Sequence, residues 1–504
     1  MLKYLPTIGM EVHVELATES KMFCSCANGL GLEKEPNKNI CPVCTGQPGS
    51  LPVPNQKAID FVIQAGLALN CQIASQSKFD RKNYFYPDLP KGYQISQFDQ
   101  PLCGRGFLDL EVLPRQGDKY EKRVGITRIH LEEDTGKLLH DKANGETWVD
   151  FNRAGVPLME LVTEPEIASS AEAKAFCQQL QLILRYLKIS PADMEKGQMR
   201  CEANISLYPR GGDRLSGTKV ELKNLNSFKA VERGIEFEIS RQAEILESGG
   251  FVRQETRGWD ENRGESFSQR SKENSNDYRY FPEPDILPLR FSNQEIEEIK
   301  RGLPELPWEK KRRLISQLGL KPDSAAVLVS APEMADYFEK VSSELENWLS
   351  EEGREFSESG KAKLNQLAAN YLITEIQRHL FSKGLSFEKI NITPENFAEL
   401  IKLVYEKTIN SSAAQIVLEE LFLRGGDPSQ IVQEKKLAQN SDVGQLEKVA
   451  RLVMEKNPQS VADYQKGKEN AVKFLVGQVM RETQGSANPE AVLEILKKLL
   501  AESV

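Results

Sequence analysis

The sequence lacks the features that mark a membrane protein or a general nucleic-acid coat. No apolar run reaches the roughly 20 residues of a membrane helix, because the longest candidate, Phe61 to Cys71, is interrupted by Gln64 and Asn70. An excess of basic residues is also missing: 65 Lys and Arg stand against 74 Asp and Glu, which gives a formal charge of −9. We therefore expect no membrane partner, and any RNA contact must be local.

Several catalytic signatures are absent as well. The nearest match to a phosphate loop, residues 212–219, ends with Thr218 and Lys219 in the wrong order. Residues 29–34 lack the third glycine of a dinucleotide fingerprint, and residues 264–268 lack the closing glycine of a serine nucleophile elbow. The start of the sequence has neither the apolar core of a signal peptide nor the composition of a transit peptide. These absences favour a cytoplasmic protein without serine hydrolase chemistry.

The sequence pattern predicts an α+β domain followed by helices. Short alternating segments separated by turn residues fill residues 1–292, whereas residues 293–392 follow a helical pattern. A further boundary is predicted near Thr393, which can cap a helix that Pro394 opens. Residues 393–504 then form a small helical tail domain, with apolar stripes at helical spacing.

The cysteines concentrate in the first half of the chain, where all eight lie at or before Cys201. Cys24 and Cys26 form one close pair, and Cys41 and Cys44 form another after fourteen intervening residues. Four thiolates can close one tetrahedral site, so we predict a structural Zn²⁺ that leaves no open position for chemistry. Reduced buried cysteines, or a redox function of Cys41 and Cys44, are the alternatives.

Acidic residues occupy defined faces of the predicted strands. In the segment 8–16 the apolar residues alternate with Glu11, His13 and Glu15, which therefore share one face. Alternation in the segment 125–137 places Glu132 with His130, and Glu133 among apolar residues. A solvated strand face is the simplest explanation for any single segment.

Burial gives the carboxylates a second interpretation. Glu133, and Glu160 within the segment 156–162, are set among apolar neighbours. A buried carboxylate needs a counter-charge, which a divalent cation or an arginine can supply. Carboxylate oxygens favour Mg²⁺, whereas a histidine ligand such as His13 leaves room for Mn²⁺.

Two strings mix basic and aromatic residues, at 79–93 and 276–285, and a third segment, 219–226, places lysines and a glutamate on one face. Such mixtures can hold phosphates and stack bases, although packed loops are the alternative for each string alone. We predict Lys223 and Arg279 as cofactor-binding cations.

Six strings together resemble the B-subunit family of tRNA-dependent aspartyl/glutamyl amidotransferases. They are Ile8-Gly-Met-Glu-Val-His-Val-Glu-Leu, Phe79-Asp-Arg-Lys-Asn-Tyr-Phe-Tyr-Pro-Asp, His130-Leu-Glu-Glu-Asp-Thr-Gly-Lys, Cys201-Glu-Ala-Asn-Ile-Ser, Glu221-Leu-Lys-Asn-Leu-Asn-Ser and Asp277-Tyr-Arg-Tyr-Phe-Pro-Glu-Pro-Asp. The resemblance spans nearly the whole chain. It implies a cradle domain related to glutamine synthetase, a helical domain and a tail that engages tRNA.

The resemblance also implies an activity and its parts. ATP would phosphorylate the side-chain carboxylate of Glu on tRNA-Gln, or of Asp on tRNA-Asn, and ammonia would displace the phosphate. The metal ligands would be His13, Glu133 and Glu160, with Glu11 nearby in the catalytic set. Here the family pattern selects Glu133 where alternation alone selects Glu132. A glutaminase (A) subunit and a small C subunit would complete a carbon–nitrogen ligase that takes its amide nitrogen from glutamine.

Two rival functions remain open from the sequence. One is a ligase of the glutamine-synthetase type acting on a free acid, for which turnover would not depend on tRNA. The other is a noncatalytic, zinc-stabilised RNA-binding subunit, for which replacing Glu133 by Gln would leave function untouched.

Overall fold

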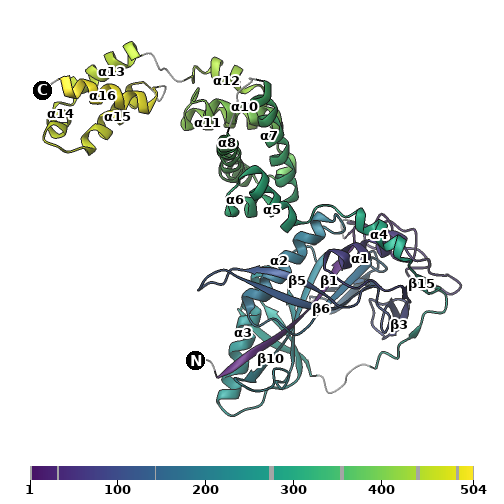
Figure 1. The fold of residues 1–504 in the computed structure, drawn as a ribbon. Helices are drawn as coiled ribbons and strands as arrows, with labels where there is room; N and C mark the ends of the chain where they lie inside the picture. The colour runs from purple at the N-terminus through teal and green to yellow at the C-terminus, as the bar shows by residue number, and fades with distance from the viewer. Residues whose placement is uncertain are drawn as a thin grey trace. The chain divides into compact units, whose positions relative to one another are not determined.

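The computed structural model describes residues 3–30, 33–141, 143–271, 277–351, 357–438, 443–483 and 487–502. The chain divides into two compact units, Met1–Leu306 and Pro307–Val504. The first unit mixes strands and helices, and the second is helical in its described part (Figure 1). The predicted α+β class with a helical C-terminal region is thus confirmed, while the division into three domains stays a prediction.

An eight-stranded sheet forms the centre of the first unit, in the order β13-β12-β11-β10-β1-β9-β6-β5. Its strands are β1 (Tyr4–Glu15), β5 (Gly106–Val112), β6 (Tyr120–Glu133), β9 (Pro157–Thr163), β10 (Met199–Pro209), β11 (Val220–Leu225), β12 (Glu255–Asp260) and β13 (Glu265–Ser271). Neighbouring strands run antiparallel except β11 and β12, which are parallel. The segment with the alternating acidic residues, β1, is therefore an inner strand.

Alternation along β1 gives the sheet one apolar and one polar face. Ile8, Met10 and Val12 are buried, and the residues between them point the other way. Helices α2 (Ser170–Tyr186) and α3 (Phe228–Glu247) pack side by side on the sheet (Figure 1). The helix α1 (Gln56–Ala68) contacts β6 and α2. Apolar burial on this side leaves the opposite face available for charged groups.

The first unit also contains smaller sheets. They comprise β14 (Phe281–Pro282), β3 (Asp80–Asn83) and β4 (Tyr93–Ser96); β15 (Leu289–Arg290) and β2 (Gln76–Ser77); and β7 (Lys137–Asp141) with β8 (Glu146–Asp150). Pairing of β14 with β3 brings the two basic and aromatic strings together, and Arg81 of one binds Glu283 of the other at 2.6 Å. The first unit ends after α4 (Asn293–Arg301).

The described residues of the second unit are mainly helical. The helices are α5 (Pro307–Leu318), α6 (Pro322–Val329), α7 (Pro332–Glu351), α8 (Glu358–Tyr371), a π-helical turn (Leu372–Ile376), α9 (Gln377–Lys383), a 3-10 turn (Phe387–Lys389), α10 (Pro394–Tyr405), α11 (Ser411–Arg424), α12 (Pro428–Glu434), α13 (Val443–Lys456), α14 (Pro458–Gln465), α15 (Asn470–Glu482) and α16 (Pro489–Glu502). The Thr393 side chain caps α10, and Pro394 opens it, as predicted. No helix in the described ranges is long and apolar enough to cross a membrane.

Candidate active site

A histidine, a glutamate and a second histidine form one row across the polar face of the large sheet. His13 of β1 lies opposite Glu160 of β9, which lies opposite His130 of β6. One oxygen of Glu160 is 3.3 Å from the Nε2 atom of each histidine. Adjacent strands are about 4.8 Å apart, so register alone places these three side chains in contact.

Two further carboxylates complete this group. The Nε2 atom of His13 is 3.8 Å from an oxygen of Glu11 and 3.8 Å from an oxygen of Glu132. We call these five residues, Glu11, His13, His130, Glu132 and Glu160, the acidic cluster. Two subsets can each offer ligand atoms within 4.8 Å of one another, namely Glu11 with His13 and Glu160, and His130 with Glu132 and Glu160. Glu160 is common to both subsets.

The charges of the acidic cluster depend on one another. Burial opposes protonation of His130, but the negative charges of Glu160 and Glu132 raise its pKa to about 9. Burial likewise opposes protonation of His13, whose pKa is nevertheless raised by the hydrogen bond and charge of Glu160. Burial, and then the charge of Glu160, raise the pKa of Glu11. Three buried or half-buried carboxylates with imidazoles suit a hard divalent cation.

The structure does not bring Glu133 into the acidic cluster. Its side chain alternates to the other face of β6, where both carboxylate oxygens lie 2.5 Å from the Nζ atom of Lys91. The backbone N–H of Ile95 on β4 donates a further hydrogen bond to it at 2.9 Å. Glu133 is only 2% exposed, so its counter-charge here is a lysine. Its assignment as a metal ligand stays a prediction.

Glu132 and His130 belong to the acidic cluster, although the family resemblance did not select them as site residues. Strand alternation in the segment 125–137 contained the signal, because it placed these two residues on one face and Glu133 on the other. The signal becomes decisive only when the strand order is known, since β9 must lie between β1 and β6 for the side chains to meet.

A cavity of about 1010 Å³ lies within the first unit. Its lining comes from both basic and aromatic strings and from β11 and its neighbours, and comprises Lys82, Asn83, Tyr84, Phe85, Tyr86, Lys223, Thr256, Gln269, Asp277, Tyr278, Arg279 and Phe281. Both predicted cofactor-binding cations, Lys223 and Arg279, are thus in one cavity wall. Cavities of this size accommodate ligands as large as a nucleotide.

Lysine side chains connect this cavity electrostatically to the acidic cluster. Burial opposes the charge of Lys82, yet the carboxylates of Glu132 and Glu160 raise its pKa above the ordinary range. The Nζ atom of Lys223 binds Glu202 at 2.7 Å, and the charge of Glu11 also acts on it. The cavity wall therefore carries Lys82 and Lys223 on the side that interacts with the acidic cluster, and Lys223 is paired there with Glu202 and Glu221.

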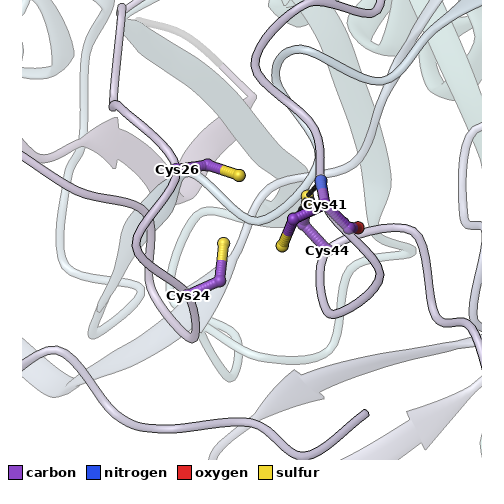
Figure 2. A group of neighbouring side chains, drawn as sticks. All are labelled: Cys24, Cys26, Cys41 and Cys44. Atoms are coloured by element: carbon purple, nitrogen blue, oxygen red, sulfur yellow. Dashed lines mark hydrogen bonds between the residues drawn. The ribbon is translucent and has the colours of Figure 1, made fainter. Parts of the chain in front are cut away.

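The four predicted cysteine ligands form a separate cluster. The thiols of Cys24, Cys26, Cys41 and Cys44 can all lie within 4.8 Å of one another, and Figure 2 shows their sulfurs directed into one space between two loops. The hydrogen bond with Cys24 lowers the pKa of the Cys44 thiol to about 5, assisted by the Cys41 backbone and the Lys21 charge and opposed by burial. This cluster can bind a metal ion, and no cysteine of the chain is in a disulfide.

Comparisons with known proteins identify the family of the chain. The model of the GatB/GatE catalytic domain matches residues 6–297, which include the acidic cluster and the four cysteines, and the GatB domain model matches residues 354–500. The chain belongs to the GatB/GatE family. It is 50% identical over 502 residues to the B subunit of the aspartyl/glutamyl-tRNA(Asn/Gln) amidotransferase from Caldicellulosiruptor bescii, covering 99% of each chain.

Other relatives in this family are similar over their full length. The B subunit of the same name from Caldanaerobacter subterraneus is 48% identical over 500 residues, which is 99% of this chain and 100% of the relative. That of Persephonella marina is 46% identical over 499 residues, again 99% and 100%. These values establish the family across both units.

Proposed function

We propose that this chain is the B subunit of a tRNA-dependent amidotransferase, in which it activates the side-chain carboxylate of a misacylated aminoacyl-tRNA for amidation. The observation that supports this most directly is the acidic cluster together with the cavity whose wall carries Lys82, Lys223 and Arg279. The substrates are Glu on tRNA-Gln, Asp on tRNA-Asn, or both, and the amide nitrogen is ammonia derived from glutamine. We also propose that the first unit is a cradle related to glutamine synthetase and acts in the cytoplasm, where aminoacyl-tRNA is used.

The reaction needs an activation step because a carboxylate is a poor acyl donor, since its oxygen is a poor leaving group until it is phosphorylated. A side-chain oxygen of the aminoacyl group attacks the γ-phosphorus of ATP, and the bond to the bridging oxygen breaks to release ADP. Ammonia then attacks the acyl carbon, phosphate leaves with the electron pair of its C–O bond, and the nitrogen loses a proton. Catalysis of such a transfer rests on positioning and charge stabilisation.

The residues of the acidic cluster fit a divalent cation. Glu11, His13 and Glu160 would hold Mg²⁺, or Mn²⁺, and Glu132 and His130 would support them from β6. When bound, the ion neutralises phosphate charge during transfer. Lys223 and Arg279 would bind ATP phosphates from the cavity wall, and Lys82 would balance the charge between the cavity and the cluster.

The cysteine cluster fits Zn²⁺, since its four sulfur donors match a closed tetrahedral site. Its role would be structural, because four protein ligands leave no position for a substrate. For assembly, we propose a glutaminase A subunit that supplies ammonia, a small C subunit, and contact between the tRNA and residues 393–504.

The decisive experiment is to separate amidation from glutamine hydrolysis in the reconstituted complex. His13→Ala should abolish ATP-dependent amidation of misacylated tRNA, while glutamine hydrolysis by the partner persists. Amidation at the wild-type rate would reject the assignment. ATP turnover with free glutamate and no tRNA would instead favour a small-molecule ligase.

A further inference from the structure

Lys21 is a buried lysine beside the cysteine cluster. Its side chain is 1% exposed, which is unusual for an ammonium group because burial without a counter-charge is costly. The Nζ atom donates to three backbone carbonyl oxygens, those of Asn39 at 2.6 Å, Ala154 at 2.8 Å and Phe151 at 3.3 Å. These three contacts match the three protons of an ammonium group.

These carbonyls accept hydrogen bonds from the ammonium group of Lys21, but they do not neutralise its positive charge. Among the described residues, no carboxylate oxygen lies within 4.0 Å of its Nζ atom. The remaining contact is the Sγ atom of Cys44 at 3.8 Å. A cysteine sulfur supplies negative charge when it is a thiolate, and four thiolates around a divalent ion retain an excess of it. The cysteine cluster is therefore the nearest anion available to Lys21.

The same side chain joins the cysteine cluster to the turn before β9. Phe151 and Ala154 belong to this turn, and the backbone N–H of Met22 donates to the carbonyl of Gly155 at 2.7 Å. Gly155 has a positive φ of 85°, and a Cβ atom there would lie 3.3 Å from the Cβ of Cys44. The turn thus packs directly against a ligand of the cluster and leads into the strand that holds Glu160.

We propose that Lys21 is the internal counter-ion of the cysteine metal site and a positioning residue that connects this site to the turn preceding β9. This proposal rests on the proposed occupation of the cysteine cluster by Zn²⁺. Lys21 offsets part of the excess thiolate charge and so slows loss of the metal. Its hydrogen bonds to the carbonyls of Phe151 and Ala154 hold the turn at residues 151–155 in place against the metal site.

The test is the rate at which the full-length chain loses zinc to a chromogenic chelator. Lys21→Gln can keep hydrogen bonds to the carbonyls but removes the charge, whereas Lys21→Met removes both. Both should release zinc about 10–100-fold faster than wild type, as outer groups of metal sites typically affect affinity by this factor. Lys38→Met is the matched control, because that lysine lies in the same loop region with its side chain 62% exposed.

Different results would overturn the counter-ion role of Lys21 and the assignment of zinc to the cysteine cluster. A rate of zinc release from Lys21→Gln within twofold of the wild-type rate would overturn the counter-ion role. This result is decisive by itself, so the test does not depend on whether Lys21→Met folds. Wild-type chain purified without bound zinc, and unable to take it up, would instead overturn the zinc assignment.

A double-mutant cycle adds a second measurement. In a chain whose cysteine site is broken by Cys44→Ser, Lys21→Gln should change the thermal midpoint by less than it does in the intact site. An equal change in both backgrounds would contradict the proposal.

Discussion

Glu132 and Glu133 are adjacent in sequence but belong to different interactions, and this difference can be measured. Glu133 has both oxygens 2.5 Å from Lys91, and the side chains of the pair are 3% and 11% exposed. Glu132 instead faces the histidines of the acidic cluster, with its oxygens 3.8 Å from His13 and 3.6 Å from His130. Replacement of each glutamate by glutamine preserves shape and removes only the charge.

The two substitutions should therefore affect different properties, the stability of the fold for Glu133→Gln and the binding of a divalent ion for Glu132→Gln. Glu133→Gln leaves the buried Lys91 ammonium without its counter-charge, which costs about 3–5 kcal/mol in comparable buried pairs and lowers the melting temperature by roughly 5–10 °C. Glu132→Gln removes a negative charge from the acidic cluster and should weaken Mg²⁺ or Mn²⁺ binding about 10–100-fold.

Calorimetry measures both quantities on the same proteins. Lys91→Met combined with Glu133→Leu is the control for the stability effect, because removing both charges should recover much of the loss. If Glu133→Gln instead weakens divalent-ion binding as much as Glu132→Gln does, the division of roles drawn from the strand geometry is refuted, and the ligand assignment from the family resemblance is supported.

Three further predictions concern the cavity, the cysteine cluster and the backbone. Lys223→Met should weaken ATP binding about tenfold in a fluorescence titration, since a phosphate-binding cation is lost; unchanged affinity would remove Lys223 from the nucleotide site. Cys41→Ser should lower the bound zinc measured by mass spectrometry of the metal, and unaltered zinc content would contradict the four-cysteine site. Gly217→Ala should destabilise the first unit in a denaturant titration, because the new Cβ atom would lie 2.3 Å from the carbonyl oxygen of Leu207. The control is Gly477→Ala in α15, where a Cβ atom would meet no neighbouring group within 4 Å. This substitution should be neutral or stabilising by up to about 1 kcal/mol.

Local patterns in the sequence were sufficient to predict much of the local structure. Alternation placed Glu11 and His13 on one face of β1, and the Thr393 cap with Pro394 located the start of α10. Both features depend only on neighbours in the sequence, through the period of a strand and the geometry of a helix terminus.

Contacts between distant segments could not be obtained in this way. The meeting of His13, Glu160 and His130 requires the strand order β1-β9-β6, which no local pattern contains. The cavity likewise depends on pairing of β14 with β3, which are about 200 residues apart in the chain. Lys21 gave no sequence signal, because its burial follows from the turn and the cysteine loop that surround it.

The proposed function requires the acidic cluster to hold a divalent ion near the cavity lined by Lys223 and Arg279. Electron paramagnetic resonance of Mn²⁺ titrated into the full-length chain, with and without ATP, measures this binding. We predict one tight Mn²⁺ site that ATP strengthens and that Glu160→Gln removes or weakens at least tenfold, since Glu160 is common to both groups of ligand atoms. Tight Mn²⁺ binding that is unchanged in Glu160→Gln would contradict the assignment of the ion to the acidic cluster.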